Sequence, residues 1–226
     1  MFFVHRIRTK RMAALALLPF AALAGSNAVA LATAVTGSPT SAQPTGATAA
    51  ASRVALKLAD KDVLAGEKVK LEGSVAPGGT QTVEIDVNGK RVKELSTAAD
   101  GHFRGGWRPE TPGVYKLEAI AGGPETPVSS GHKRVNAYRA VQASYYGPGL
   151  YGGQLACGGV LTPSKLGVAN KTLPCGAKVT LRHGNQTLTV PVIDRGPYAG
   201  NRVYDLTAAT KSKLGFGSTG IVLATR

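Results

Sequence analysis

The sequence predicts an all-β protein in which a β-sandwich is followed by a compact β-barrel with one short helix. Short alternating apolar runs between turn signals fill residues 54–139, which is typical of a sandwich. Residues 140–226 are rich in Gly and in short apolar runs, and contain only one stretch of helical character. The 226 residues are enough for one large or two small domains.

Residues 1–34 are predicted to be an export signal. The basic start "MFFVHRIRTKR" is followed by the apolar "MAALALLPFAALAG", and small residues allow cleavage after Ala30 or Ala34. A retained membrane anchor is the alternative, but Pro19 and the polar residues after Gly25 leave the apolar run short of about 18 residues. We therefore expect a secreted or cell-wall-associated protein that meets the membrane only through the uncleaved signal.

Residues 35–53, "VTGSPTSAQPTGATAAASR", consist almost entirely of small, polar and Pro residues. Such a composition cannot bury a core, so a flexible linker is predicted here.

The predicted sandwich, residues 54–139, contains the runs "VALKLAD", "EKVKLEGSV", "TVEIDVNGKRV", "GHFRGGWRP" and "GVYKLEAIAGG". Asn88-Gly89 between alternating arms is the strongest hairpin signal. The segments "LAGEKV", "TAADGHF" and "PGVYKLEA" resemble those of bacterial immunoglobulin-like domains, which implies an Ig-like sandwich. Trp107 is expected to pack in its core, although a sugar-stacking role is the alternative.

The predicted barrel, residues 140–226, contains the runs "VQASYYG", "GVLT", "KLGVAN", "KVTLRHG", "QTLTVPVID" and "IVLATR". One helix is predicted in "TAATKSKLG". Thr207 is a suitable N-cap, Lys211 and Lys213 suit the C-terminal end, and Gly215 ends the helix.

Acidic residues are scarce in this second region. Residues 141–226 carry nine Lys/Arg but only two carboxylates, Asp194 and Asp205, both within "VPVIDRGPYAGNRVYDL". The resulting charge of +7 fits an anionic polymer such as cell wall. It would also fit nucleic acid, but export and the lack of a recognition motif argue against a nucleic-acid partner.

The two carboxylates are the candidate catalytic residues. His183 is the only His in the barrel region and lies in a predicted hairpin turn, so a Ser-His-Asp system is disfavoured. Cleavage of a glycosidic bond needs a carboxyl proton donor, and Asp194 at a strand end is placed to face a cleft. The alternatives are an Asp194–Arg195 ion pair and an Asp205 that only stabilises the following helix.

Tyrosines beside glycines support a sugar partner, because their rings pack on sugar faces and their hydroxyls form hydrogen bonds. Tyr146, Tyr151 and Tyr198, with Arg195, are the predicted substrate-binding residues. Alternation in "ASYYG" predicts that one of Tyr145 and Tyr146 points inward.

Cys157 and Cys175 are the only cysteines, with 17 residues between them. In an exported protein a disulfide is the simplest interpretation, and a loop of this size adds about 3 kcal/mol of stability. A catalytic thiol is less favoured. A zinc site would have two Cys and one His and would lack a ligand, so neither a metal nor another cofactor is predicted.

The barrel region resembles the rare lipoprotein A (RlpA) family of double-psi β-barrels, which are related more distantly to expansins. The matching segments are "ASYYGPGLYGG", "KTLPCGAKV", "VPVIDRGPYAGNR" and "YDLTAATKSKLG". The resemblance implies a six-stranded barrel that acts on peptidoglycan glycan strands. Active members are lytic transglycosylases, in which Asp194 matches the catalytic Asp and Asp205 matches an important polar residue of expansin-like relatives.

The sequence also departs from the family pattern. Gly159 occupies the place of a family Glu, Asn170 replaces a His, and the lipid-attachment Cys is missing. Two functions therefore stand: a secreted lytic transglycosylase, or a non-catalytic, expansin-like module that binds or loosens the wall. An inhibitor or adhesin on the same barrel is a weaker third, and the sequence makes no prediction of oligomeric state.

Overall fold

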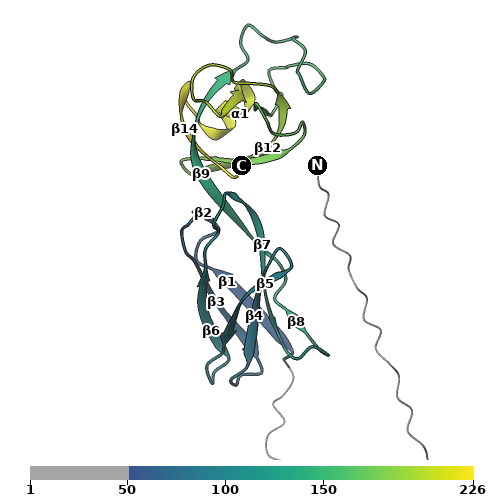
Figure 1. Ribbon diagram of the computed structural model, residues 1–226, viewed down its shortest axis with the longest axis vertical. Coiled ribbons are helices and arrows are strands. Elements are labelled where there is room, and N and C mark those ends of the chain that lie inside the picture. Colours follow the sequence, from purple (N-terminus) through teal and green to yellow (C-terminus); the bar gives the residue numbers. More distant parts are fainter. Residues whose placement is uncertain (1–50) are drawn as a thin grey trace, which may run out of the picture. The chain divides into compact units, whose positions relative to one another are not determined.

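The computed structural model describes residues 51–226, so the predicted export signal and all but the last three residues of the predicted linker lie outside the described residues. In the described part, strands and one helix follow the predicted pattern (Figure 1). The elements in chain order are β1 (Arg53–Leu58), β2 (Asp62–Leu64), β3 (Val69–Ala76), β4 (Thr82–Val87), β5 (Lys90–Ser96), β6 (His102–Trp107), β7 (Gly113–Ala121), β8 (Val128–Ser129), β9 (Lys133–Tyr146), β10 (Val168–Ala169), β11 (Lys178–His183), β12 (Gln186–Asp194), β13 (Tyr204–Thr207), α1 (Ala208–Leu214) and β14 (Thr219–Ala224).

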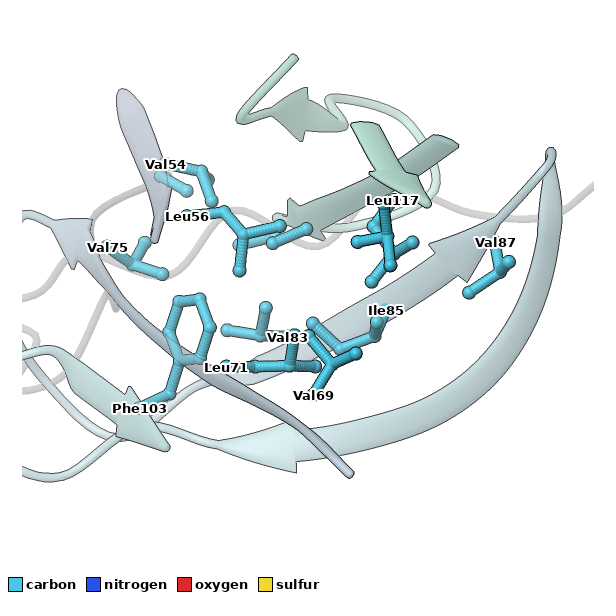
Figure 2. Packing of buried hydrophobic residues seen from close by; sticks show 14 of the residues in the cluster. Val54, Leu56, Val69, Leu71, Val75, Val83, Ile85, Val87, Phe103 and Leu117 are labelled. Carbon is cyan, nitrogen blue, oxygen red and sulfur yellow. The ribbon is translucent and has the colours of Figure 1, made fainter. Parts of the chain in front are cut away.

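The N-terminal β region, residues 51–137, is built from two groups of strands. One is the three-stranded sheet β1-β3-β6, and the other contains β4, β5, β7 and the beginning of β9. Their alternating residues meet in one apolar core, where Val54, Leu71 and Phe103 lie close to Ile85 and Leu117 (Figure 2). Full burial of each Val or Leu side chain contributes about 1.5–3 kcal/mol. The immunoglobulin-like identity of this region stays a prediction from the sequence.

Two sequence signals of this region have clear counterparts in the structure. Asn88 and Gly89 join β4 to β5 with φ of 53° and 78°, the positive values that a tight two-residue hairpin turn requires. Trp107 is partly buried against the core, and its ring packs edge-on against Tyr115 at 5.0 Å between centroids. The predicted packing role of Trp107 is therefore confirmed.

Six strands close into a barrel in the second half of the chain. The order is β13-β10-β12-β11-β14-β9, and β9 pairs again with β13, which closes the circle. Two of these pairs, β10 with β12 and β13 with β9, are parallel, while the others are antiparallel. The interior is a second apolar core whose fully buried members include Val168, Leu181 and Leu206.

The predicted helix is confirmed together with both of its ends. The Thr207 side chain accepts a hydrogen bond from the Thr210 backbone N–H, and Gly215 ends the helix with φ of 60°. Lys211 and Lys213 lie in its last turn. Among residues 51–226 there is no helix of the length and apolarity needed to cross a membrane.

One of the short apolar runs of the second region does not form a strand. The run "GVLT", residues 159–162, forms only an isolated bridge between Gln154 and Val160. Its apolar side chain, Leu161, packs instead with Leu155 and Ile193 in a small third cluster. In addition, the last residue of the predicted linker, Arg53, already belongs to β1, and β9 runs through the predicted boundary at residue 140.

Candidate functional site

The strand order of the barrel brings the two predicted catalytic carboxylates to one place. In the register of β10, Ala169 lies opposite Asp194 on β12 and also opposite Asp205 on β13. Asp205 lies in turn opposite Ser144 on β9. Residues directly opposite each other on neighbouring strands point to the same face of a sheet, so Asp194, Asp205 and Ser144 share one face with the small side chain of Ala169 between them.

Asp194 is held by backbone donors at the end of β12. Its Oδ1 accepts hydrogen bonds from the backbone N–H of Ala156 and of Arg195, both at 2.9 Å. The register of β10 and β12 shifts at this point, as in a β-bulge, which re-aims the side chain at the strand end. The Asp194 carboxylate also interacts with the side chain of Tyr146, which raises the pKa of that tyrosine.

Asp205 does not cap the helix. The N-cap is Thr207, and the first turn of α1 contains no acidic residue. The Asp205 carboxylate instead accepts a 2.6 Å hydrogen bond from the Ser144 hydroxyl, and Arg202 Nη1 donates to the same Ser144 oxygen at 2.9 Å. The hydrogen-bond partner of Asp205 is therefore Ser144 on β9 rather than a backbone N–H of the helix, and a stabilising effect of its charge on α1 stays a prediction.

Tyr146 is close enough to both carboxylates for their charges to act on its hydroxyl. It is two residues beyond Ser144 on β9, so it projects from the same face, and its ring packs against the Leu155, Leu161 and Ile193 cluster. Its hydroxyl oxygen is buried and has no hydrogen-bond partner among the described residues. Burial raises the pKa of Tyr146, the negative charges of Asp194 and then Asp205 raise it further, and a weak hydrogen-bonding interaction of the hydroxyl with Asp194 adds to the rise. The hydroxyl therefore stays protonated at neutral pH.

The Asp194–Arg195 ion pair, the alternative to a functional Asp194, is absent from the ion pairs of residues 51–226. The Arg195 guanidinium turns to the 170–175 segment, where Nη1 donates to the Leu173 carbonyl at 3.0 Å and Nη2 contacts the Cys175 Sγ at 3.1 Å. Nη1 also donates to the Asn170 carbonyl. Arg195 thus fixes the loop beside Asp194, and its predicted contact with substrate stays a prediction.

The disulfide between Cys157 and Cys175 is confirmed, with 5.5 Å between the Cα atoms. It joins two segments that lie beside the Asp194 carboxylate. Cys157 follows Ala156, whose N–H binds Asp194, and Cys175 receives the side chain of Arg195. The disulfide therefore ties together the two loops that orient Asp194.

The other predicted tyrosines take different positions. A methyl group placed on Gly147 would lie 3.1 Å from the Tyr151 hydroxyl, so this hydroxyl lies beside Gly147, while the Tyr151 side chain is exposed. Tyr198 follows the Gly196-Pro197 turn and is 79% exposed. Tyr204 is fully buried, and Tyr145 contacts Lys211 through its ring at 4.4 Å. As alternation predicts, the two neighbours in "ASYYG" face different sides of the strand.

Two polar residues of this site, Ser144 and Arg202, were missed from the sequence, and Asn170 was noted only as a departure from the family pattern. Asn170 is 5% exposed, and its side-chain oxygen accepts from the Thr172 and Leu173 N–H groups. Ser144 could have been found as the residue on the same strand face as Tyr146. Arg202 carries no local signal. Residues 51–226 contain no cluster of three or more His, Cys, Asp or Glu side chains that would hold a metal ion.

Comparison with known proteins finds relatives for the barrel region of the chain. Residues 138–224 match the double-psi β-barrel family model described as "Lytic transglycolase". A probable endolytic peptidoglycan transglycosylase RlpA from Synechocystis sp. is 35% identical over 47% of this chain, and the endolytic peptidoglycan transglycosylase RlpA of Campylobacter jejuni is 39% identical over 34%.

These alignments cover 38% and 29% of the two relatives, so the chain matches well under half of either protein. A crystal structure of an engineered protein is 22% identical over 38% of this chain and 20% of its own, and its TM-score of 0.28 carries no argument. Together with the closed six-stranded circle, the family match identifies residues 138–224 as a double-psi β-barrel domain similar to RlpA.

Proposed function

We propose that the barrel binds peptidoglycan glycan strands and cleaves them as a lytic transglycosylase outside the cytoplasm. The observation that carries the proposal is the convergence of Asp194, Asp205 and the buried, unpartnered Tyr146 hydroxyl on one face of the barrel. The similar proteins named endolytic peptidoglycan transglycosylases support this substrate. The disulfide fits an oxidising, extracytoplasmic compartment.

In the proposed reaction Asp194 acts first as acid and then as base. Its carboxyl group gives a proton to the glycosidic oxygen, and the bond from that oxygen to the sugar C1 breaks. The carboxylate then takes the proton of the sugar's own 6-hydroxyl while that oxygen bonds to C1 and closes an anhydro ring. Asp194 ends protonated, as it began, and no water is consumed. A second carboxylate is therefore not required as nucleophile.

Tyr146 and Asp205 are proposed to orient the glycan in this step. The raised pKa keeps the Tyr146 hydroxyl protonated, so it is a hydrogen-bond donor close to the acid. A buried donor without a partner costs about 1–3 kcal/mol, and a bound sugar oxygen would satisfy it. Asp205, fixed by Ser144, supplies acceptors for sugar hydroxyls on the same face. Exposed Tyr151 and Tyr198 add ring surfaces for the sugar.

A second candidate function is a non-catalytic wall-binding or wall-loosening module, and Gly159 favours it. This residue stands where the resemblance places a catalytic Glu, and its φ of 80° suits Gly rather than Glu. Open space surrounds it, with the Lys165 ammonium 4.0 Å from the position of an added Cβ. Residues 141–226 contain no third acidic residue to replace that Glu. In this case the two carboxylates are glycan contacts.

The two functions are separated with isolated peptidoglycan. Wild type, Asp194→Asn and Asp205→Asn are incubated with it, and soluble products are read by mass spectrometry for anhydro-sugar ends while the pellet is read for bound protein. Glu125→Gln, an exposed carboxylate in the N-terminal β region, is the matched control. We expect Asp194→Asn to lower product formation by about 10²-fold or more with pellet binding retained.

Each remaining result has one meaning. If wild type and all variants bind peptidoglycan without forming products, the lytic transglycosylase is rejected and the non-catalytic wall-binding module is the function. Products undiminished in Asp194→Asn would remove this residue from the chemistry. Absence of both products and binding in the folded wild type would reject peptidoglycan as the substrate.

A further inference from the structure

A basic cleft lies in the N-terminal β region, at one edge of its sheets. It is lined by Leu56, Lys57, Leu58, Ala59, Lys61, His132, Lys133 and Arg134, and has a volume of about 550 Å³. This volume is within the range of sites that hold small ligands or a few units of a polymer. No acidic residue lines it, and its residues belong to β1, to the turn after β1, and to the beginning of β9 with His132 just before it.

The four lysine and arginine side chains of the cleft have no acidic partners. Within residues 51–226 the ion pairs involve Arg91, Arg104 and two histidines, and none involves Lys57, Lys61, Lys133 or Arg134. The nearby acid Asp62 is already used, since its Oδ1 accepts from Asn136 Nδ2 and from the Tyr138 hydroxyl, both at 2.7 Å. Glu118 is engaged by His132 and Ser129. Asp60 and Asp62 lie in the turn beside the hollow, but no acidic side chain lines it, and its four lysine and arginine side chains are free of ion pairs among the described residues.

The backbone on both sides of the cleft is held by core packing and hydrogen bonds. Leu56 is 4% exposed and points into the core of Figure 2, so the β1 wall cannot move without disturbing that core. On the other side, the beginning of β9 is paired with β7, and Asn136 N–H donates to the Lys61 carbonyl at 2.7 Å. Arg134 is fixed by hydrogen bonds from Nε to Asn136 Oδ1 and from Nη2 to Thr180 Oγ1. The charges thus project from ordered backbone.

We propose that this basic cleft binds an anionic cell-wall polymer, one that carries a phosphate diester or a carboxylate on each repeat. Unpaired cations around a concave site attract repeated anions, and Leu58 and Ala59 give an apolar surface to the polymer's carbon chain. That the polymer belongs to the cell wall rests on the proposed function, but the site is separate from the barrel carboxylates and does not depend on the proposed catalysis. It would hold the protein on the wall.

Protection of a strand edge and binding of nucleic acid are two further roles that basic side chains can have. Lysines beside an exposed edge prevent edge-to-edge aggregation, and β1 is such an edge, with β3 its only partner among the described strands. Nucleic acid is also a polyanion, but no Phe, Tyr or Trp lines the cleft for the stacking of bases. Edge protection alone requires no hollow, so the wall polymer is the occupant that the lining favours.

The test measures binding of the full chain to three soluble probes: poly(glycerol phosphate), polyglutamate and a DNA duplex. The variant is the triple change Lys57→Gln, Lys61→Gln and Lys133→Gln, with Arg134 kept because of its structural hydrogen bonds. The matched control is Lys68→Gln, Lys90→Gln and Lys93→Gln, three exposed lysines outside the cleft that carry the same charge change.

We expect the cleft variant to lose about tenfold or more in affinity for at least one of the first two probes, and the control less than about twofold. The loss should shrink at high salt, because salt screens exposed charges. Binding of poly(glycerol phosphate) would identify phosphate as the anionic group that the cleft recognises, and binding of polyglutamate would identify carboxylate. Equal affinities of the two variants, or binding of the duplex alone, would overturn the proposal, and thermal unfolding shows whether each variant is folded.

Discussion

The Tyr146 hydroxyl is buried without a partner among the described residues, and this predicts an unusual outcome for its removal. In Tyr146→Phe we expect the free energy of unfolding to stay equal or rise by about 1 kcal/mol, because an unsatisfied polar group disappears while the ring packing remains. Glycan turnover, or glycan affinity if the barrel only binds, should fall by about tenfold. Urea unfolding and the peptidoglycan assay measure the two effects.

Tyr145→Phe is the control for this change, since it removes the neighbouring hydroxyl from the opposite side of the same strand. If Tyr146→Phe loses stability and keeps full turnover, the hydroxyl is structural and the orienting role is wrong.

At the scale of single elements, the sequence was sufficient to predict those elements that depend only on neighbouring residues. The α1 helix, its Thr207 cap and its Gly215 end depend on a few adjacent residues, and all were predicted. Residues 159–162 look like a strand but do not form one, because their apolar residue packs into a side cluster rather than into the barrel. Short apolar runs do not distinguish these two outcomes.

The meeting of Asp194 with Asp205 was expected only from resemblance, because it depends on which strands become neighbours. Both residues flank Ala169 through one parallel and one antiparallel pairing, and β13 reaches β9 across about 60 residues of chain. The pairing register of strands so far apart in the chain cannot be predicted from a local sequence pattern. The partners Ser144 and Arg202 follow from the same long-range pairing, which is why they were missed.

The disulfide carries a prediction about the two loops that it joins. Reduction, or the double change Cys157→Ser and Cys175→Ser, should lower the free energy of unfolding by about 3 kcal/mol because the unfolded chain regains the freedom of the loop. It should also lower turnover in protein that remains folded, since Ala156 and Arg195 would no longer be held around Asp194. Urea unfolding and product analysis, each with and without reductant, measure these losses.

Turnover that survives reduction at a urea concentration where the protein is still folded would show that the loops orient Asp194 without the disulfide. A disulfide-free variant as stable as wild type would contradict the chain-entropy argument.

At the scale of the whole molecule, buried tyrosines make alkaline pH the sensitive condition. Burial raises the pKa of Tyr204 to about 12, and it also raises the pKa of Tyr138 and of Tyr146. All three lie on β9 or on its partner β13. Above about pH 10 these tyrosines ionise in the unfolded chain while they stay neutral in the folded one, so their contribution to stability is complete below pH 10 and is lost as the pH rises.

We therefore predict that the free energy of unfolding falls between about pH 10 and pH 12, by about 1.4 kcal/mol per pH unit for each tyrosine that ionises only on unfolding. Urea unfolding at pH 9, 10 and 11 measures the slope. Tyr204→Phe should be less stable at pH 9, because the 2.7 Å hydrogen bond from its hydroxyl to the Arg226 carbonyl is lost, but its slope should be shallower by one proton. Tyr198→Phe, at a 79% exposed position, should keep the wild-type slope. Equal slopes in wild type and Tyr204→Phe would mean that another group controls alkaline unfolding, and the buried strand tyrosines would lose that role.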